Sequence, residues 1–229
     1  MIVSVKPATH VLIMGPQGAG KGTQAAVVGP RLGLVHVSTG DLFREVMASG
    51  TPLGDEIRGY VDRGALVPDE LTVRMLMDRI DALRREHPEI AGALIDGFPR
   101  NQAQAAALER ALGVRGERLA GVISIEVPRP VLIERLSGRL ICPNCGATYH
   151  REFNPPKVPG ICDVCGAALA QRSDDTPEAV ARRLAIYDEQ TQPVLDHYQH
   201  QGLLLPVDGD RPIEEVTTAI LEAVGPWIG

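Results

Sequence analysis

Short apolar runs alternate with longer amphipathic segments along the 229-residue chain. Five mainly apolar runs predict strands at His10–Met14, Leu34–Val37, Ala93–Ile95, Val122–Val127 and Leu203–Val207. Segments with helix-like spacing follow or separate them, at Lys21–Leu32, Asp41–Ser49, Gly54–Asp62, Asp69–Glu86, Gln102–Leu112, Arg129–Ser137, Pro177–Gln201 and Pro212–Val224. Strand and helix in alternation are typical of a parallel sheet with helices on both faces. We therefore predict an α/β fold with a doubly wound, five-stranded parallel sheet.

One stretch, Gly138–Asp175, breaks this alternation and lacks helical periodicity. It holds all four cysteines of the chain, in two pairs that are each followed by glycine: Cys142 and Cys145, then Cys162 and Cys165. Two Cys-x-x-Cys pairs in one small insert indicate a zinc site. Four thiolates leave no open coordination position, so this zinc would be structural. A rubredoxin-like iron site and disulfides are the alternatives.

The composition is that of a globular protein, 44% hydrophobic and 23% charged, with a net charge of -6. This charge argues against a general nucleic-acid or anionic-membrane binder. The apolar runs are too short for a membrane-spanning helix, and Met1 to Ala8 lack the apolar core of a signal peptide. We expect a cytoplasmic protein with no membrane partner and no nucleic-acid partner.

The cations are mostly arginine: of 23 Lys and Arg residues, only Lys6, Lys21 and Lys157 are lysines. Two explanations are open. Base composition of the genome can favour arginine codons, or arginine can be required because its planar fork binds phosphate.

A glycine-rich segment connects the first predicted strand to the first predicted helix, with the residues Gly15-Pro16-Gln17-Gly18-Ala19-Gly20-Lys21-Gly22-Thr23. Glycines let backbone N–H groups approach a polyphosphate, the helix N-terminus adds partial positive charge, and Lys21 reaches the outer phosphates. In the general motif a Ser or Thr that binds Mg²⁺ follows the lysine. Here Gly22 takes that position and the hydroxyl comes one residue later, at Thr23. The sequence predicts a nucleotide-binding P-loop that departs from the GTPase and motor arrangement.

This Lys-Gly-Thr form of the loop resembles the nucleoside monophosphate kinases. The resemblance continues in order through Ser38–Arg44, Gly64–Asp69, Asp96–Arg100 with Gln104, Arg135–Arg139, Phe153–Lys157, and Arg172–Asp175 with Arg183. Within that family the chain is similar to adenylate kinases of the long-lid bacterial type. The resemblance implies a P-loop kinase core at residues 1–37, 68–137 and 176–229. It also implies a helical insert for the nucleoside monophosphate (NMP) at residues 38–67 and a zinc-bound lid at residues 138–175.

The arginine-rich motifs suit the chemistry of such a kinase. A monophosphate acceptor is already ionised near neutral pH, so the reaction needs no carboxylate base. The obstacle is charge, because each pair of unit charges at 4 Å repels by about 4 kcal/mol at an effective dielectric constant near 20. Arginines between the two polyanions neutralise them and hold them in line.

The resemblance assigns residues to two nucleotide sites. The ATP site would comprise Gly18, Ala19, Gly20, Lys21, Gly22, Thr23, Arg135, Arg139, Thr148, Tyr149 and Arg211. The AMP site would comprise Thr39, Arg44, Ala65, Leu66, Val67, Gly97, Arg100, Gln104, Arg172 and Arg183. The catalytic set would be Lys21, Arg100, Arg139, Arg172, Arg183 and Asp96, of which Asp96 would orient water on Mg²⁺. Asp174 and Asp175 would be partners of these arginines.

We therefore expect an ATP:AMP phosphotransferase that converts Mg·ATP and AMP into two ADP by direct in-line transfer, acting as a monomer with Mg²⁺ and structural Zn²⁺. The resemblance to the family at Thr39 favours adenine as the acceptor base, whereas the donor base, ATP or GTP, is open. One alternative is a kinase for another monophosphate such as CMP or UMP. Another is a nucleotide-switched zinc module that binds nucleic acid or protein.

Overall fold

The computed structural model describes residues 7–62, 66–171 and 175–228. Its centre is a five-stranded parallel sheet with the strand order β2-β3-β1-β4-β7. The strands are β1 (Thr9–Met14), β2 (Leu34–Ser38), β3 (Gly92–Asp96), β4 (Arg118–Glu126) and β7 (Leu204–Asp208). Each overlaps one of the predicted apolar runs, so the predicted α/β fold with a parallel sheet is confirmed.

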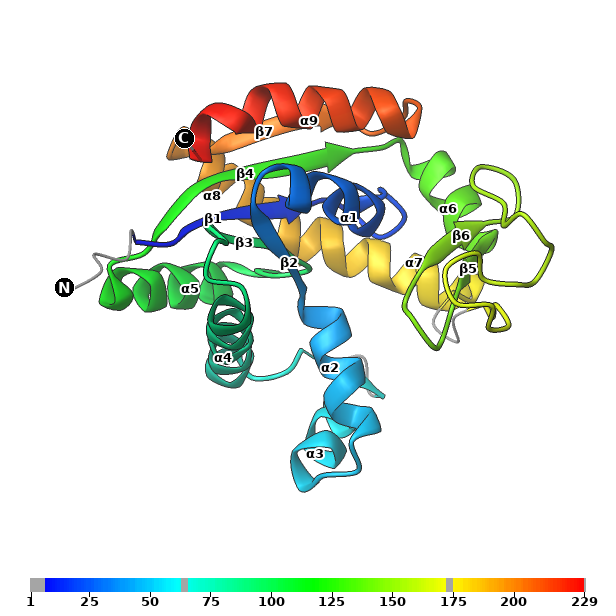
Figure 1. Ribbon diagram of the computed structural model, residues 1–229, viewed down its shortest axis with the longest axis horizontal. Helices are drawn as coiled ribbons and strands as arrows, with labels where there is room; N and C mark the ends of the chain where they lie inside the picture. Colours follow the sequence, from blue (N-terminus) through cyan, green and yellow to red (C-terminus); the bar gives the residue numbers. More distant parts are fainter. Residues whose placement is uncertain (1–6, 63–65, 172–174, 229) are drawn as a thin grey trace.

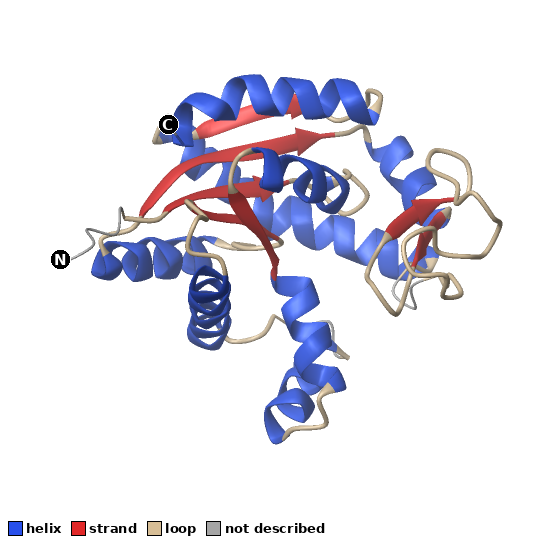
Figure 2. Ribbon diagram, viewed as in Figure 1, coloured by secondary structure: helices blue, strands red, loops and turns tan. Residues whose placement is uncertain are grey.

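Helices cover both faces of the sheet (Figure 2). One face packs against α1 (Lys21–Arg31), α6 (Arg129–Ser137), α7 (Pro177–Ile186) and α9 (Ile213–Ile228). The other packs against α4 (Asp69–Glu86), α5 (Gln102–Arg115) and α8 (Gln192–His200). Along β1, Val11 and Ile13 join the first core, and Leu12 and Met14 join the second. Because both faces are buried, the strands are apolar at successive positions rather than at alternate ones.

Two segments project from this core (Figure 1). Between β2 and α4 the chain forms α2 (Thr39–Ala48) and α3 (Pro52–Val61). The side chains of Ser38 and Thr51 cap the two helices by accepting backbone N–H groups. After α6 comes a small antiparallel pair, β5 (Arg139–Ile141) and β6 (Thr148–His150), with the cysteine loops around it. The described part of the 138–175 stretch contains no helix, as its sequence predicts.

The long helix predicted at Pro177–Gln201 is not uniform. Between α7 and α8 lies one π-helical turn, η1 (Tyr187–Thr191), in which the N–H of Gln192 donates to the carbonyl of Tyr187. The apolar spacing of this segment predicts a single α-helix, and it gives no sign of the extra residue in that turn.

The carboxyl ends of three strands meet at one edge of the sheet. Asp96, the last residue of β3, pairs with Ile13 of β1 and with Ser38 of β2. This edge is where ligands bind in open α/β sheets. Within the described ranges, no helix combines the length and the apolar character needed to cross a bilayer.

Candidate active site

The glycine-rich loop lies between β1 and the N-terminus of α1, as the sequence predicts. Gly15, Gly18 and Gly20 have positive φ angles of 140°, 87° and 92°, which other residues rarely adopt. A Cβ atom on Gly15 would lie 2.5 Å from the carbonyl oxygen of Ile125 in β4. Among the described residues, no side chain caps α1, and its first turn carries no acidic group. The free N–H groups of this helix end can therefore bind an anion.

Lys21 is the first residue of α1, and its Nζ donates to the carbonyl oxygens of Gly15 (2.8 Å) and Pro16 (2.9 Å). Burial lowers the pKa of Lys21 to about 8, although the negative charge of Asp96 opposes the shift. Three other positive charges lower this pKa further, those of Arg100, Arg139 and Arg183. The loop lysine is thus held among like charges, which an anionic ligand would relieve.

The loop after β3 joins three residues that the sequence assigns to the acceptor site. Thr39, at the start of α2, is buried, and its Oγ1 donates to the carbonyl of Gly97 at 3.0 Å. The Nε of Arg100 donates to the same carbonyl at 2.9 Å. One carbonyl oxygen therefore positions both the threonine hydroxyl and the arginine side chain next to Asp96.

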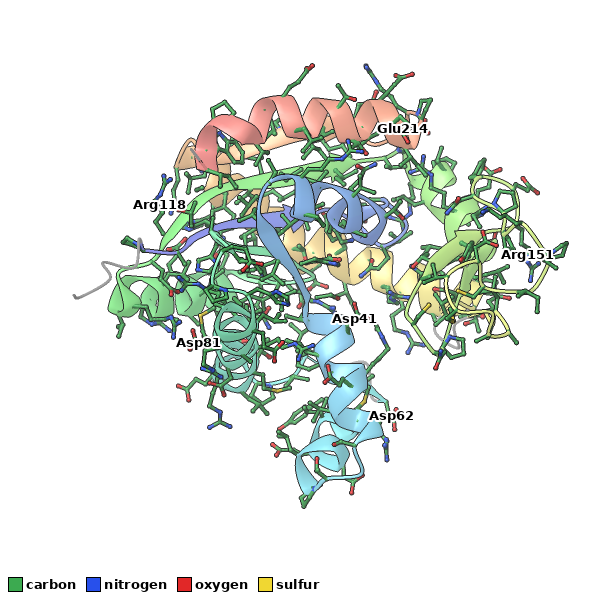
Figure 3. The ribbon with its side chains drawn as sticks, in the orientation of Figure 1. Asp41, Asp62, Asp81, Arg118, Arg151 and Glu214 are labelled. Atoms are coloured by element: carbon green, nitrogen blue, oxygen red, sulfur yellow. The ribbon has the colours of Figure 1, made fainter. Side chains whose placement is uncertain are left out.

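The charged form of the Arg100 guanidinium is destabilised by its surroundings. Its pKa is lowered chiefly by burial and next by the charge of Arg183, with Asp96 acting in the opposite sense and Arg44 adding to the lowering. Arg44 itself pairs with Asp41, which Figure 3 labels in the first turn of α2. Mutually repelling cations beside a helix N-terminus are typical of a site for a highly charged anion.

Gln104 lies in the first turn of α5 and is only 3% exposed. Asn101 caps this helix by accepting the N–H of Gln104 at 2.8 Å. The Oε1 of Gln104 accepts the backbone N–H of Arg100 at 2.8 Å. Because a backbone N–H can only donate, this contact fixes the orientation of the amide and leaves its NH₂ group to donate elsewhere.

Asp175 connects the end of the cysteine-containing stretch to two of the predicted arginines. Its side chain is fully buried, and it accepts two bonds from Arg139, at 2.8 Å from Nε and 2.5 Å from Nη2. It also accepts a bond from Nη1 of Arg183 at 3.3 Å. The two-bond contact fixes the plane of the Arg139 guanidinium. Asp175 is therefore a partner of the arginines, as the sequence predicts.

Arg135 and Arg211 meet at the loop that follows β7. Nη1 of Arg135 donates to the carbonyl of Gly209 at 3.0 Å, and its Nη2 lies 3.6 Å from Asp210. Nε of Arg211 donates to Asp208 at 2.9 Å and lowers the pKa of that carboxyl. These two arginines come from positions far apart in sequence, and the fold brings both to one loop.

The four cysteine sulfurs lie within 4.8 Å of one another. None is in a disulfide, so that alternative is wrong for this structure. In each pair the first cysteine is buried and the second is exposed. Tetrahedral zinc with bonds of about 2.3 Å places its sulfur ligands roughly 3.8 Å apart, which this cluster can accommodate.

Two matching turns build this cluster. In the first, Gly146 N–H donates to the carbonyl of Cys142, and in the second, Gly166 N–H donates to that of Cys162, both at 2.9 Å. The two glycines have φ of 75° and 73°, in the left-handed region that a metal-binding turn uses. The glycine after each second cysteine was therefore an accurate sequence signal for this turn.

Thr148 and Tyr149 lie in β6, where their backbone pairs with β5. Thr148 is exposed, whereas Tyr149 is buried and points its hydroxyl into the cysteine cluster. Tyr149 Oη accepts the N–H of Asp163 at 2.8 Å and lies 3.4 Å from Sγ of Cys162. The resemblance places Tyr149 in the ATP site, and the spacing of the cysteines does not predict the contact of its side chain with them.

Three predicted residues, Ala65, Arg172 and Asp174, lie outside the described part of the chain. Leu66 is half-buried and Val67 is buried, immediately before α4. Sequence reasoning missed His36, whose Nε2 lies 3.6 Å from Oδ2 of Asp96. A single histidine within a predicted strand carries no signal of such a contact.

The adenylate kinase family matches residues 13–203, which is most of the chain. The chain belongs to the adenylate kinase family. It is 53% identical over 215 residues to an adenylate kinase of Carboxydothermus hydrogenoformans, covering 93% of this chain and 98% of that protein. It is 50% identical over 217 residues to an adenylate kinase of Moorella thermoacetica, covering 94% and 98%. An adenylate kinase of Clostridium beijerinckii is 46% identical over 215 residues, with coverage of 94% and 98%.

Membership of the adenylate kinase family confirms the resemblance inferred from the motifs. It also confirms the predicted enzyme class, an ATP-binding phosphotransferase. The match extends across the cysteine-containing stretch at residues 138–175. An identification based on the P-loop alone would not have covered that part of the chain.

The pKa of Lys21 leads to a prediction for ATP binding. Below about pH 8 the lysine is charged before ATP arrives, so we expect affinity to be nearly constant with pH. Above about pH 8 the free protein loses this proton, ATP binding must take it up again, and Kd should rise toward about tenfold per pH unit. Isothermal titration calorimetry in two buffers of different ionisation enthalpy measures both the affinity and the proton uptake.

Lys21→Met is the control, because its weaker ATP binding should show neither proton uptake nor this slope. A constant wild-type Kd up to about pH 9.5 would mean that the pKa of Lys21 is not lowered.

Proposed function

We propose that this protein transfers the terminal phosphoryl group of Mg·ATP to AMP, giving two ADP. One observation carries the proposal: the positive charges of Arg100, Arg139 and Arg183 lower the pKa of Lys21, and those of Arg183 and Arg44 lower the pKa of Arg100, while Asp96 opposes both shifts. Such a cluster costs folding free energy unless anions bind to it. Two nucleotides with adjacent phosphates would supply the negative charge that these cations need.

The ATP site would use the P-loop and the arginines near the β7 loop. The N–H groups at the start of α1 and the amine of Lys21 would hold the outer phosphates. Arg135 and Arg211, which meet beside Gly209, would complete this site together with Arg139 and the backbone of Thr148 and Tyr149. The geometry of the free helix end and the position of Lys21 support this assignment.

The AMP site would lie on the loop after β3. Arg100 and Arg44 would bind the AMP phosphate, with Thr39, Gly97 and the chain near Ala65, Leu66 and Val67 around the nucleoside. Gln104 supports adenine as the base, because its oriented NH₂ group can donate to the N1 acceptor of adenine. Guanine and uracil present an N–H at the corresponding ring position, so the same amide would face a donor.

The transfer itself needs position and charge more than proton chemistry. The AMP phosphate is ionised near neutral pH, so its oxygen can attack the terminal phosphorus directly. Arg139 and Arg183 share the carboxylate of Asp175 and would turn to the phosphoryl group as it moves, together with Arg172 from the lid. These cations would neutralise the charge on the transferring phosphoryl group. They would also hold ATP and AMP in line for the transfer.

The residues near Asp96 suit a magnesium ion held with the nucleotide. A Cβ on Gly22 would lie 3.9 Å from Oδ2 of Asp96, so this glycine leaves open space beside the carboxylate. We propose that Asp96 orients water on Mg²⁺. We also propose that Thr23 supplies the hydroxyl group that the general P-loop motif carries one residue earlier, at the position of Gly22. When bound, Mg²⁺ would offset the negative charge of the ATP phosphates.

The cysteine cluster suits a structural zinc ion, held by Cys142, Cys145, Cys162 and Cys165. The stretch around it has a small apolar core of its own, in which Cys142, Tyr149 and Cys162 are the buried members. A metal would supply folding free energy that so small a core lacks. We propose residues 138–175 as a zinc-stabilised lid, residues 38–67 as the NMP-binding insert, and a monomer as the working form.

A coupled assay of ADP formation tests the reaction. Wild-type protein with Mg·ATP should turn over AMP and should show little activity with CMP, UMP or GMP. Arg100→Ala should lower AMP turnover roughly 100-fold or more, because one charge-stabilising group is lost. Its melting temperature should stay close to wild type, since the substitution removes a charge that lies near other cations and Thr39 still donates to the carbonyl of Gly97.

Arg110→Ala is the matched control, because Arg110 is an exposed arginine in α5 and its removal should leave turnover unchanged. Turnover of CMP or UMP but not AMP would make the protein a kinase for another monophosphate. No turnover with any monophosphate would favour the nucleotide-switched zinc module.

Metal analysis tests the cysteine cluster. Protein purified without chelators should contain about one zinc per chain. Cys142→Ser and Cys162→Ser should each reduce this content to a small fraction, and proteolysis within residues 139–171 should become faster while the core stays resistant. Val164→Ala, an exposed position between two of the ligands, should keep its zinc. Stoichiometric iron, or metal-free protein with the same protease resistance, would contradict the zinc assignment.

A further inference from the structure

The π-helical turn η1 lies between two α-helices that serve different parts of the molecule. α7 carries Arg183, and α8 packs its apolar side chains into the core formed with α4 and α5. Turns of this type are rare and occur frequently at functional sites. One additional residue in a helix rotates every later side chain by about 100°. The turn therefore determines which side chain of the helix faces the loop after β3, which contains Arg100.

The side chain placed there is Thr191, the last residue of η1, which is 7% exposed. Its Oγ1 donates a hydrogen bond of 2.9 Å to the backbone carbonyl of Arg100, 91 residues earlier in the chain. Because the carbonyl can only accept, the proton belongs to the threonine hydroxyl. Thr191 therefore bonds directly to the peptide unit that carries the proposed AMP-binding arginine.

This bond differs from those of two other helical threonines, Thr72 and Thr218. Each of these donates to the backbone carbonyl four residues earlier, that of Pro68 or that of Glu214. A threonine inside a helix commonly satisfies its hydroxyl in this local way. Thr191 instead donates to another element, as Thr39 does from α2 to the carbonyl of Gly97.

The loop between Asp96 and Arg100 is consequently held from two sides. Thr39 donates to one end of it, at Gly97, and Thr191 to the other end, at Arg100. Between these contacts, the N–H of Arg100 donates to Gln104 and its Nε donates to Gly97. With these bonds in place, both backbone polar groups of Arg100 are fixed, and the guanidinium direction follows from them.

We propose that Thr191 is a positioning residue for the acceptor site, in which its hydroxyl holds the Arg100 peptide so that the guanidinium is ready for the AMP phosphate. The proposal rests on the proposed function, since it assigns a supporting role for AMP binding. Thr191 itself would touch no nucleotide. Its effect passes through Arg100, so it should alter AMP binding and leave ATP binding intact.

The test compares Thr191→Val, which keeps the shape without the hydroxyl, with Thr191→Ala and with Thr191→Ser, which keeps the hydroxyl. Calorimetry measures the Kd of AMP and of ATP separately, and steady-state kinetics separate KM for AMP from kcat. We expect Val and Ala to raise Kd and KM for AMP about fivefold to tenfold, as the loss of one hydrogen bond predicts. The Kd of ATP should stay within about twofold of wild type, and Ser should restore AMP binding.

Thr217→Val is the matched control, a buried threonine in α9 whose hydroxyl bonds to Ile213 and Gln24. It should lower the melting temperature without a selective change in AMP affinity. Two results would overturn the inference: unchanged AMP affinity in Thr191→Val and Thr191→Ala, or equal losses for AMP and ATP together with a lower melting temperature. Failure of the wild-type protein to bind AMP would overturn the proposed function and the inference with it.

Discussion

Repulsion between like charges at the carboxyl edge of the sheet is the constraint on which the rest of this molecule depends. Burial lowers the pKa of both Lys21 and Arg100, and nearby cations lower each further: Arg100, Arg139 and Arg183 act on Lys21, and Arg183 and Arg44 act on Arg100. Without a nucleotide, two carboxylates supply the opposing charge, Asp96 at the end of β3 and the buried Asp175. The cluster therefore lowers the stability of the free protein, and bound anions would restore that stability.

The cations of this cluster come from parts of the chain that have no local reason to meet. Lys21 begins α1, Arg100 follows β3, Arg139 begins β5, and Arg183 lies in α7. The parallel sheet brings the first two together, because its strands end at one edge. Asp175 brings the other two together by accepting bonds from both. Each of these cations belongs to a motif that the sequence shows, whereas their repulsion arises only in the assembled fold.

Much of the architecture could be predicted, because strong local signals agreed with the fold. The apolar runs located the five strands of the sheet, and α4 and α6 have the predicted ends at Asp69, Glu86, Arg129 and Ser137. The π turn before Gln192 could not be predicted, since the residues Asp188 to Gln192 are all polar and show no apolar spacing that would reveal an extra residue. Contacts such as Thr191 with Arg100 depend on that turn, so they could not be predicted either.

The cysteine stretch illustrates how a structural centre can serve a charged site. Arg139 is the first residue of β5, and this strand pairs with β6, in which Tyr149 lies opposite Leu140. The Tyr149 hydroxyl accepts the N–H of Asp163, so its own proton is free to point at the sulfur of Cys162. A metal held by the cysteines would therefore stiffen the hairpin through Tyr149, and a stiff hairpin presents Arg139 in one orientation. Asp175 and the four cysteines would then act in the same way, because both hold cations in place against their mutual repulsion.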